Sequence, residues 1–232
     1  MTCLSFGVQA QDPTAETVIE NYIKAIGGRE AIDKIKDITI SSTSENPRGT
    51  AETEIKMKMP DKYMMSVYTN GMELYSIVNN GEKSVRKSQW GGGNQEAKEG
   101  KEAKAEAMRM SPFQEMNYVV LEIKMKNMGL EKVGETEAYK LEFTGQTGNV
   151  FYAWFDKTSG LKLKTSMKGK NPRSGEEIEN ITTLENYTKF KGTEVLIPKI
   201  SKRSGGPMGE SVSETQSVKV NKGLEDKVFE IK

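Results

Sequence analysis

An amphipathic helix pair followed by a long series of strand-like segments is the feature that most limits what this chain can fold into. Residues 16–26 carry apolar side chains at helical spacing, which form a single stripe. Asp12-Pro13 supplies a cap and a first-turn proline, and Gly27 permits the left-handed conformation that ends a helix. A shorter apolar stripe follows in residues 31–35, and nearly everything after Lys36 is typical of strands. The helix pair therefore requires a sheet to pack on.

Most of the chain after the helix pair alternates between apolar and polar residues. Residues 51–59 place alanine, threonine, isoleucine and methionine on one face and glutamate and lysine on the other, as in a half-buried antiparallel strand. Asn70-Gly71 and Asn80-Gly81 are hairpin turn signals. The strands are expected at residues 37–45, 51–59, 62–68, 72–78, 83–90, 138–144, 149–155, 161–168, 178–190, 194–202, 211–220 and 228–231. No linker separates the two halves, so we expect one α+β domain over residues 11–232.

The strand pattern is interrupted between Trp90 and Leu130. Gly91-Gly92-Gly93 is a candidate hinge, and residues 94–110 are rich in alanine, glutamate and lysine with a thin apolar side. Two interpretations stay open for this segment: a solvated surface helix, or a mobile cover over an open side of the sheet. A short helical piece is expected at 113–118, and residues 119–125 could continue it.

Composition excludes several classes of function. The formal net charge of +1 gives no reason to expect nucleic acid as a partner, and no apolar run reaches the roughly 18 residues of a membrane span. The chain has no histidine and one cysteine, which removes the common nucleophile systems, most catalytic zinc sites and internal disulfides. The pairs Glu52/Glu54 and Glu176-Glu177 fall on a wet strand face or in turns. We therefore predict a protein that is not an enzyme and uses no cofactor or metal.

Residues 1–10 resemble the end of a secretory signal peptide. Val8-Gln9-Ala10 fits the small-x-small rule for cleavage, although the charged start and most of the apolar region are missing. An ordinary disordered N-terminus is the alternative. The signal interpretation predicts a periplasmic or secreted protein.

Two stretches resemble a known family. The segment Tyr22-Ile23-Lys24-Ala25-Ile26-Gly27-Gly28, and the hairpin between Ala138 and Leu161, are similar to outer-membrane lipoprotein-sorting (Lol carrier-like) proteins. A similar domain is appended to insulinase-like zinc peptidases, but their zinc-binding histidines are absent here, so no peptidase activity carries over. The resemblance implies a strongly curved antiparallel sheet, an open half-barrel over the helix pair and an internal helical lid. It also implies that acyl chains bind on the concave face.

Methionines and aromatic residues are the candidate ligand contacts. Unbranched thioethers adapt to ligands of varied shape, but they also fill ordinary cores, and both interpretations stay open. Aromatic residues occupy both faces of the strand at 149–155, and ordinary core is the competing explanation for them. The candidate ligand-binding residues are Ile55, Met57, Met59, Met64, Met65, Met108, Met110, Tyr152 and Trp154.

Two functions from different classes follow. The first is a periplasmic or secreted carrier of lipid or lipoprotein acyl chains, with the segment 91–110 gating entry. The second is an interaction module of the cell envelope with a filled core and a protein partner. The absence of histidine argues against a third class, a hydrolase.

Overall fold

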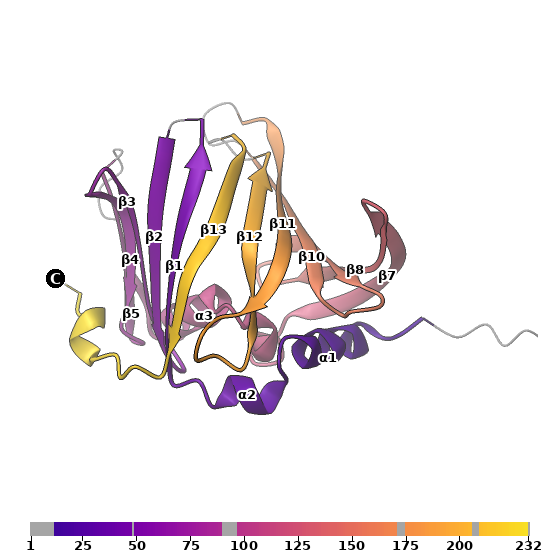
Figure 1. Cartoon of the computed structure of the whole chain (residues 1–232), viewed down its shortest axis with the longest axis horizontal. Coiled ribbons are helices and arrows are strands. Elements are labelled where there is room, and N and C mark those ends of the chain that lie inside the picture. Colours follow the sequence, from indigo (N-terminus) through magenta and orange to yellow (C-terminus); the bar gives the residue numbers. More distant parts are fainter. Residues whose placement is uncertain (1–11, 48, 90–96, 171–174, 206–208, 232) are drawn as a thin grey trace, which may run out of the picture.

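The structure is a computed structural model that describes residues 12–47, 49–89, 97–170, 175–205 and 209–231. Its strands form one antiparallel sheet of 13 strands in the order β6-β5-β4-β3-β2-β1-β13-β12-β11-β10-β9-β8-β7 (Figure 1). The strands are β1 Asp37–Asn46, β2 Gly49–Lys58, β3 Lys62–Thr69, β4 Met72–Asn79, β5 Lys83–Ser88, β6 Lys98–Glu99, β7 Lys124–Val133, β8 Thr136–Thr144, β9 Val150–Asp156, β10 Lys162–Lys170, β11 Glu177–Lys189, β12 Leu196–Ser204 and β13 Ser211–Val220. The sheet curves without closing into a barrel, which confirms the predicted α+β half-barrel.

The first and last strands of the chain, β1 and β13, pair with each other in the middle of the sheet. Ile38 pairs with Val220 and Ile40 with Val218, while β1 pairs on its other side with β2. The chain therefore runs outward from β1 to β6 on one side, and returns from β7 at the opposite edge to β13. This topology leaves β6 and β7 as the two ends of the sheet.

The helices are α1 Ala15–Ala25, α2 Arg29–Asp33, α3 Gly100–Met110 and the 3₁₀ turn η1 Gln114–Asn117. In Figure 1 helix α3 lies behind β1, β13 and β12, while α1 and α2 lie at the lower end of the sheet. The predicted stripe of α1 is confirmed, since Val18, Ile19, Tyr22 and Ile23 are all buried. The cap differs from the prediction: the Thr14 hydroxyl, and not Asp12, accepts the backbone N–H of Thr17 at 3.2 Å.

The segment predicted as a solvated helix or a mobile cover is docked on the sheet. Residues 98–99 form β6, which pairs with β5, and the helix begins only at Gly100. Ala103 and Ala107 of α3 are fully buried, and the Asn79 side chain donates a 2.7 Å hydrogen bond to the Ala103 carbonyl. The helix is therefore an integral cover of the interior. The candidate hinge Gly91-Gly92-Gly93 lies outside the described residues.

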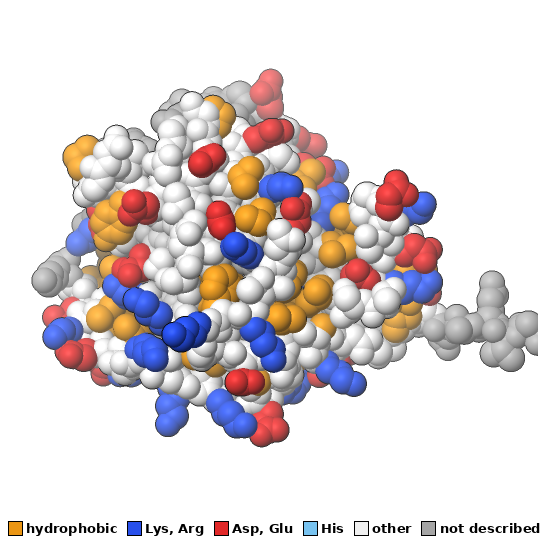
Figure 2. All heavy atoms as spheres, in the orientation of Figure 1, with side chains coloured by type: hydrophobic (Ala, Val, Ile, Leu, Met, Phe, Trp, Pro, Cys, Tyr) orange, Lys and Arg blue, Asp and Glu red, His pale blue; other side chains and the backbone are white. Residues whose placement is uncertain are grey.

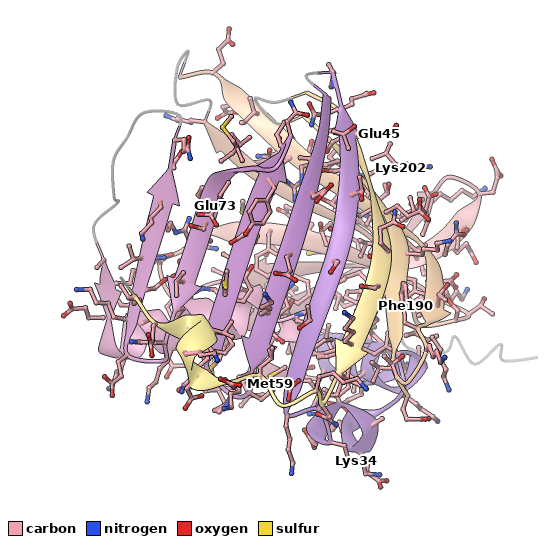
Figure 3. The ribbon with its side chains drawn as sticks, turned by 60° about the vertical axis from the view of Figure 1, so that its left-hand side comes forward. Lys34, Glu45, Met59, Glu73, Phe190 and Lys202 are labelled. Carbon is pink, nitrogen blue, oxygen red and sulfur yellow. The ribbon has the colours of Figure 1, made fainter. Side chains whose placement is uncertain are left out.

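Two further boundaries differ from the sequence prediction. Strand β7 begins at Lys124, so residues 124–125 do not continue the preceding helical piece. The C-terminal segment expected as a strand at 228–231 is instead the 3₁₀ turn η2, Asp226–Phe229. Lys58 and Lys62 both form ion pairs with Asp226, at 2.7 and 3.0 Å, which holds η2 against the convex face of the sheet (Figure 3).

The convex face carries charges of both signs with apolar side chains between them (Figure 2). Figure 2 shows lysine and arginine side chains interspersed with acidic ones over the strands that face the viewer. Among the described residues no helix is long and apolar enough to span a membrane.

Candidate functional site

The lower part of the concave face is filled by the helices. Ile38, Met57, Tyr63 and Ile77 on neighbouring strands are at most 2 % exposed and pack in one cluster with the apolar side of α1. Interiors packed in this way leave little room for a ligand. A binding site therefore has to be sought where the helices stop covering the sheet.

Above the helices the concave face becomes rich in hydroxyl groups. Side chains alternate along a strand, so Ser42 and Ser44 continue the face that carries Ile38 and Ile40. Their cross-strand partners on β13 are Thr215 and Ser213, and the row continues into other strands. The partly buried hydroxyl residues of this face include Ser42, Ser44, Thr53, Thr182, Ser201, Ser213 and Thr215. Apolar residues share this face, since Ala51 lies opposite Ser44 and Leu184 opposite Ser201, so the surface is mixed and not uniformly apolar as the family resemblance implies.

A cleft of about 550 Å³ lies between α3 and the turn that joins β8 to β9. Lys98 of β6 lines one side and residues 145–149 line the other, so its walls come from the two ends of the sheet. We call this the mouth cleft. Its lining residues are Lys98, Lys101, Glu102, Ala105, Arg109, Gln114, Tyr118, Leu121, Ile123, Gly145, Gln146, Thr147, Asn149 and Phe151.

Helix α3 presents different residues to the sheet and to the mouth cleft. Ala103, Glu106 and Ala107 are buried on its sheet side. Lys101, Ala105 and Arg109 line the mouth cleft, and their spacing of four residues places them on one helical face. The small side chain of Ala105 leaves space between two long basic side chains.

The apolar floor of the mouth cleft is continuous with the core. The Phe143 and Phe151 rings are stacked with centroids 4.7 Å apart, and the Tyr118 and Phe143 centroids are 5.2 Å apart. Phe143 is fully buried, whereas Phe151 and Tyr118 reach the cleft together with Leu121 and Ile123. Burial and the nearby Glu115 carboxylate raise the pKa of Tyr118 well above its ordinary value, so its hydroxyl stays protonated.

Glu106 anchors the opposite side of α3. This carboxylate is 2 % exposed, and it accepts hydrogen bonds from Lys98 at 2.6 Å, from Arg86 at 2.5 Å and from the Ser84 hydroxyl. Burial alone raises the pKa of Glu106, but these three donors outweigh it and lower the pKa to about 2. The helix wall of the mouth cleft is therefore fixed to β5 and β6.

A second buried ion pair lies behind the mouth cleft. Lys162 Nζ is 2.5 Å from Glu115 Oε1 and 5.1 Å from the centre of the Tyr22 ring. Burial lowers the pKa of Lys162, but the Glu115 and Tyr187 side chains act against this and the net shift is upward. Glu115 Oε2 has no hydrogen-bond partner among the described residues. The pair ties η1, whose Gln114 lines the cleft, to β10.

Four of the nine predicted ligand-binding residues lie on the concave face. Ile55, Met57, Met59 and Met65 pack in or against the core, and Figure 3 labels Met59 just past the end of β2. They support the interior behind the helices and do not line the mouth cleft.

Three predicted residues lie on the opposite, convex face of the sheet. Met64 is next to the concave-facing Tyr63 and Met65, so it points to the convex side. Tyr152 and Trp154 are also convex; Lys164 Nζ lies 4.4 Å from the Trp154 ring centre. The Trp154 indole N–H donates a 2.9 Å hydrogen bond to Glu131. These aromatic rings pack beneath lysine side chains and do not line the mouth cleft.

The remaining two, Met108 and Met110, lie near the carboxyl end of α3. Met108 is half-buried and Met110 is 36 % exposed; neither lines the mouth cleft. Sequence reasoning missed the basic stripe at Lys101 and Arg109. Lys101 and Arg109 each lie four residues from Ala105, and this helical spacing of basic residues is visible in the sequence.

Comparison with known proteins gives a likeness of fold. No family model and no curated protein matches the sequence. A LolA superfamily protein from Nitrosomonas europaea has a similar structure, with a TM-score of 0.61 and 14% identity over 95% of this chain and 99% of that one. A putative outer membrane lipoprotein-sorting protein domain from Vibrio parahaemolyticus gives a TM-score of 0.53 and 15% identity over 93% of this chain and 97% of that one. The resemblance read in the sequence is thus confirmed at the level of the fold.

Proposed function

We propose that this protein is a non-enzymatic carrier of lipid-like or acylated molecules, which it binds in the mouth cleft, and that it works in the periplasm or outside the cell. The observation that carries this proposal is that the apolar core reaches the protein surface beneath α3, in the floor of the mouth cleft. An acyl chain on Tyr118, Leu121 and Phe151 would leave water at about 0.8 kcal/mol per buried CH₂ group. The polar turn at 145–149 offers hydrogen bonds to the rest of such a ligand.

The fold comparison supports the same class of ligand. The Vibrio protein is described as a lipoprotein-sorting domain, and lipoproteins are acylated. The site differs from the one that the sequence resemblance implies, because hydroxyl groups on the open part of the concave face make it a less favourable surface for acyl chains than the apolar floor of the mouth cleft. We therefore assign the apolar part of the ligand to the mouth cleft.

Binding of a fluorescent fatty acid tests this proposal. The delipidated protein should bind the probe, and octanoate, decanoate and dodecanoate should displace it with affinities that rise by up to about fourfold per added CH₂ group. The variant Ala105→Trp fills the mouth cleft and should lose binding while keeping its melting temperature. Lys104→Trp places the same ring on an exposed position of α3 outside the cleft and should bind normally. Probe binding that is equal in both variants would exclude the mouth cleft.

An interaction module of the cell envelope is the second candidate. The packed interior favours it, since Met57, Tyr63 and Ile77 are buried in the core cluster together with the apolar side of α1. In this case the protein would bind an envelope protein and ignore amphiphiles. A protein partner recovered after crosslinking in cells, from protein that carries no lipid and binds no probe, would favour this function over the carrier.

A further inference from the structure

We infer that the ligand of the mouth cleft is an anionic amphiphile, whose carboxylate or phosphate group binds at the amino end of α3 beside Lys98 and Lys101. This inference rests on the proposed function and specifies the chemical class of its ligand. Three basic residues and one acidic residue line the cleft: Lys98, Lys101 and Arg109 against Glu102. This excess of positive charge attracts an anionic ligand, gives no electrostatic gain with a neutral ligand and repels a cationic one.

The two ends of the mouth cleft differ in polarity. Asn117 donates a 3.2 Å hydrogen bond to the Met108 carbonyl, so the apolar floor that follows η1 lies beside the carboxyl end of α3. Lys98 and Lys101 lie at the amino end of the helix, where the helix dipole also favours an anion. An amphiphile therefore fits in one direction, with its chain on Tyr118 and Leu121 and its charge toward Lys101.

The charges around Lys98 leave this end of the cleft positive. Arg86 and Lys98 share the single carboxylate of Glu106, so this trio keeps one positive charge. Lys101 is exposed and forms no ion pair with the described residues; Glu102 offsets one charge beside it. The result is a net charge of +1 over these five side chains, on a wall that Glu106 holds in place.

Arg109 provides a matched comparison within the same cleft. It is exposed like Lys101 and lies eight residues further along α3, about 12 Å along the helix axis. A head group beside Lys101 is separated from Arg109 by more than the screening length of salt water, about 8 Å at physiological ionic strength. Charge reversal at the two positions should therefore have unequal effects.

Binding of ligands that share one chain and differ in head group tests the inference. Calorimetry should show that dodecanoate and dodecyl phosphate bind more tightly than monododecanoylglycerol, and that dodecylamine binds least. Lys101→Glu should lower the affinity for dodecyl phosphate by about tenfold. Lys101→Gln should have a smaller effect in the same direction, Arg109→Glu should change affinity by less than about twofold, and the neutral glyceride should bind all variants alike. The control Lys126→Glu, an exposed position on β7, should bind like the wild type.

The outcomes separate this inference from the proposed function. Equal affinity for the anionic and neutral ligands, or an Arg109→Glu effect as large as that of Lys101→Glu, overturns the head-group assignment and leaves the carrier in place. Failure of all four amphiphiles overturns the carrier itself. Inorganic phosphate alone should not bind measurably; binding as tight as that of dodecyl phosphate would assign the site to a free anion and overturn the inference.

Discussion

Glu106 on α3 forms an ion pair with Arg86 on β5, with 2.5 Å between Oε1 of the glutamate and Nη2 of the arginine. The contact crosses from the helical layer to the sheet, and Lys98 of β6 joins it on the same carboxylate oxygen. Because Glu106 is buried, this cluster is a direct polar link between α3 and the sheet beneath it. We expect the helix wall of the mouth cleft to depend on this link.

Removal of the Glu106 charge should destabilise the fold. Glu106→Gln leaves Arg86 and Lys98 without their shared carboxylate, which should lower the free energy of unfolding by about 3 kcal/mol. Urea unfolding of the purified variant measures this difference. The exposed Glu102→Gln on the same helix is the control and should stay within about 0.5 kcal/mol of the wild type. A Glu106→Gln variant as stable as this control would show that α3 does not depend on the cluster.

Acid should weaken the same contact. The folded pKa of Glu106 is about 2, below its ordinary value of 4.5, so its charge stabilises the folded state above pH 4.5. That contribution declines as the pH falls from about 4.5 and is lost near pH 2. The stability difference between wild type and Glu106→Gln should therefore be largest near neutral pH and shrink through this window. A difference that stays constant from pH 7 to pH 2.5 would contradict the assignment.

The buried Glu115–Lys162 pair should show strong coupling. Lys162→Met leaves a buried carboxylate without its cation and should cost about 3–5 kcal/mol of stability. Adding Glu115→Gln removes that uncompensated charge, so the double variant should be more stable than Lys162→Met alone. Chemical unfolding of the two single variants and the double variant gives the coupling energy. Additive losses would mean that the two side chains do not act as a pair.

Gly27 should resist substitution more than a glycine in an open turn. Its φ is +127°, and an added Cβ would lie 2.9 Å from the Glu194 carbonyl oxygen, where the chain after α1 meets β12. Gly27→Ala should cost about 2–3 kcal/mol through strain and displacement of this backbone. Gly134→Ala is the control, since its φ is +60° and no atom lies within 4 Å, and it should cost about 1–2 kcal/mol. Thermal unfolding measures the stability of both variants. Equal losses of stability would contradict a role for the close approach of Gly27 to the Glu194 carbonyl.

The fold was predictable because periodicity and turn chemistry act locally. The stripe of α1 and the turn residues Asn70-Gly71 encode where helices and hairpins form, and the structure confirms both. The docking of α3 was not predictable in the same way. Its inward side holds Ala103, Ala107 and a glutamate, a pattern that looks solvated unless Arg86 and Lys98 are known to lie opposite.

The site was only partly accessible from the sequence. Alternation assigns Tyr152 and Trp154 to one strand face, but the curvature of the sheet decides which face is concave. The lysines opposite them, Lys140 and Lys164, were a signal for the solvent-facing side. The mouth cleft joins residues from opposite ends of the sheet, and such long-range contacts leave no local pattern.

Native mass spectrometry tests most directly whether the mouth cleft holds an amphiphile. Delipidated wild-type protein mixed with dodecanoate should show one added ligand mass per chain, Lys104→Trp should show the same, and Ala105→Trp should show the unliganded mass alone. Wild-type protein that takes up no dodecanoate, or an Ala105→Trp variant that takes up as much as the wild type, would contradict the proposed function.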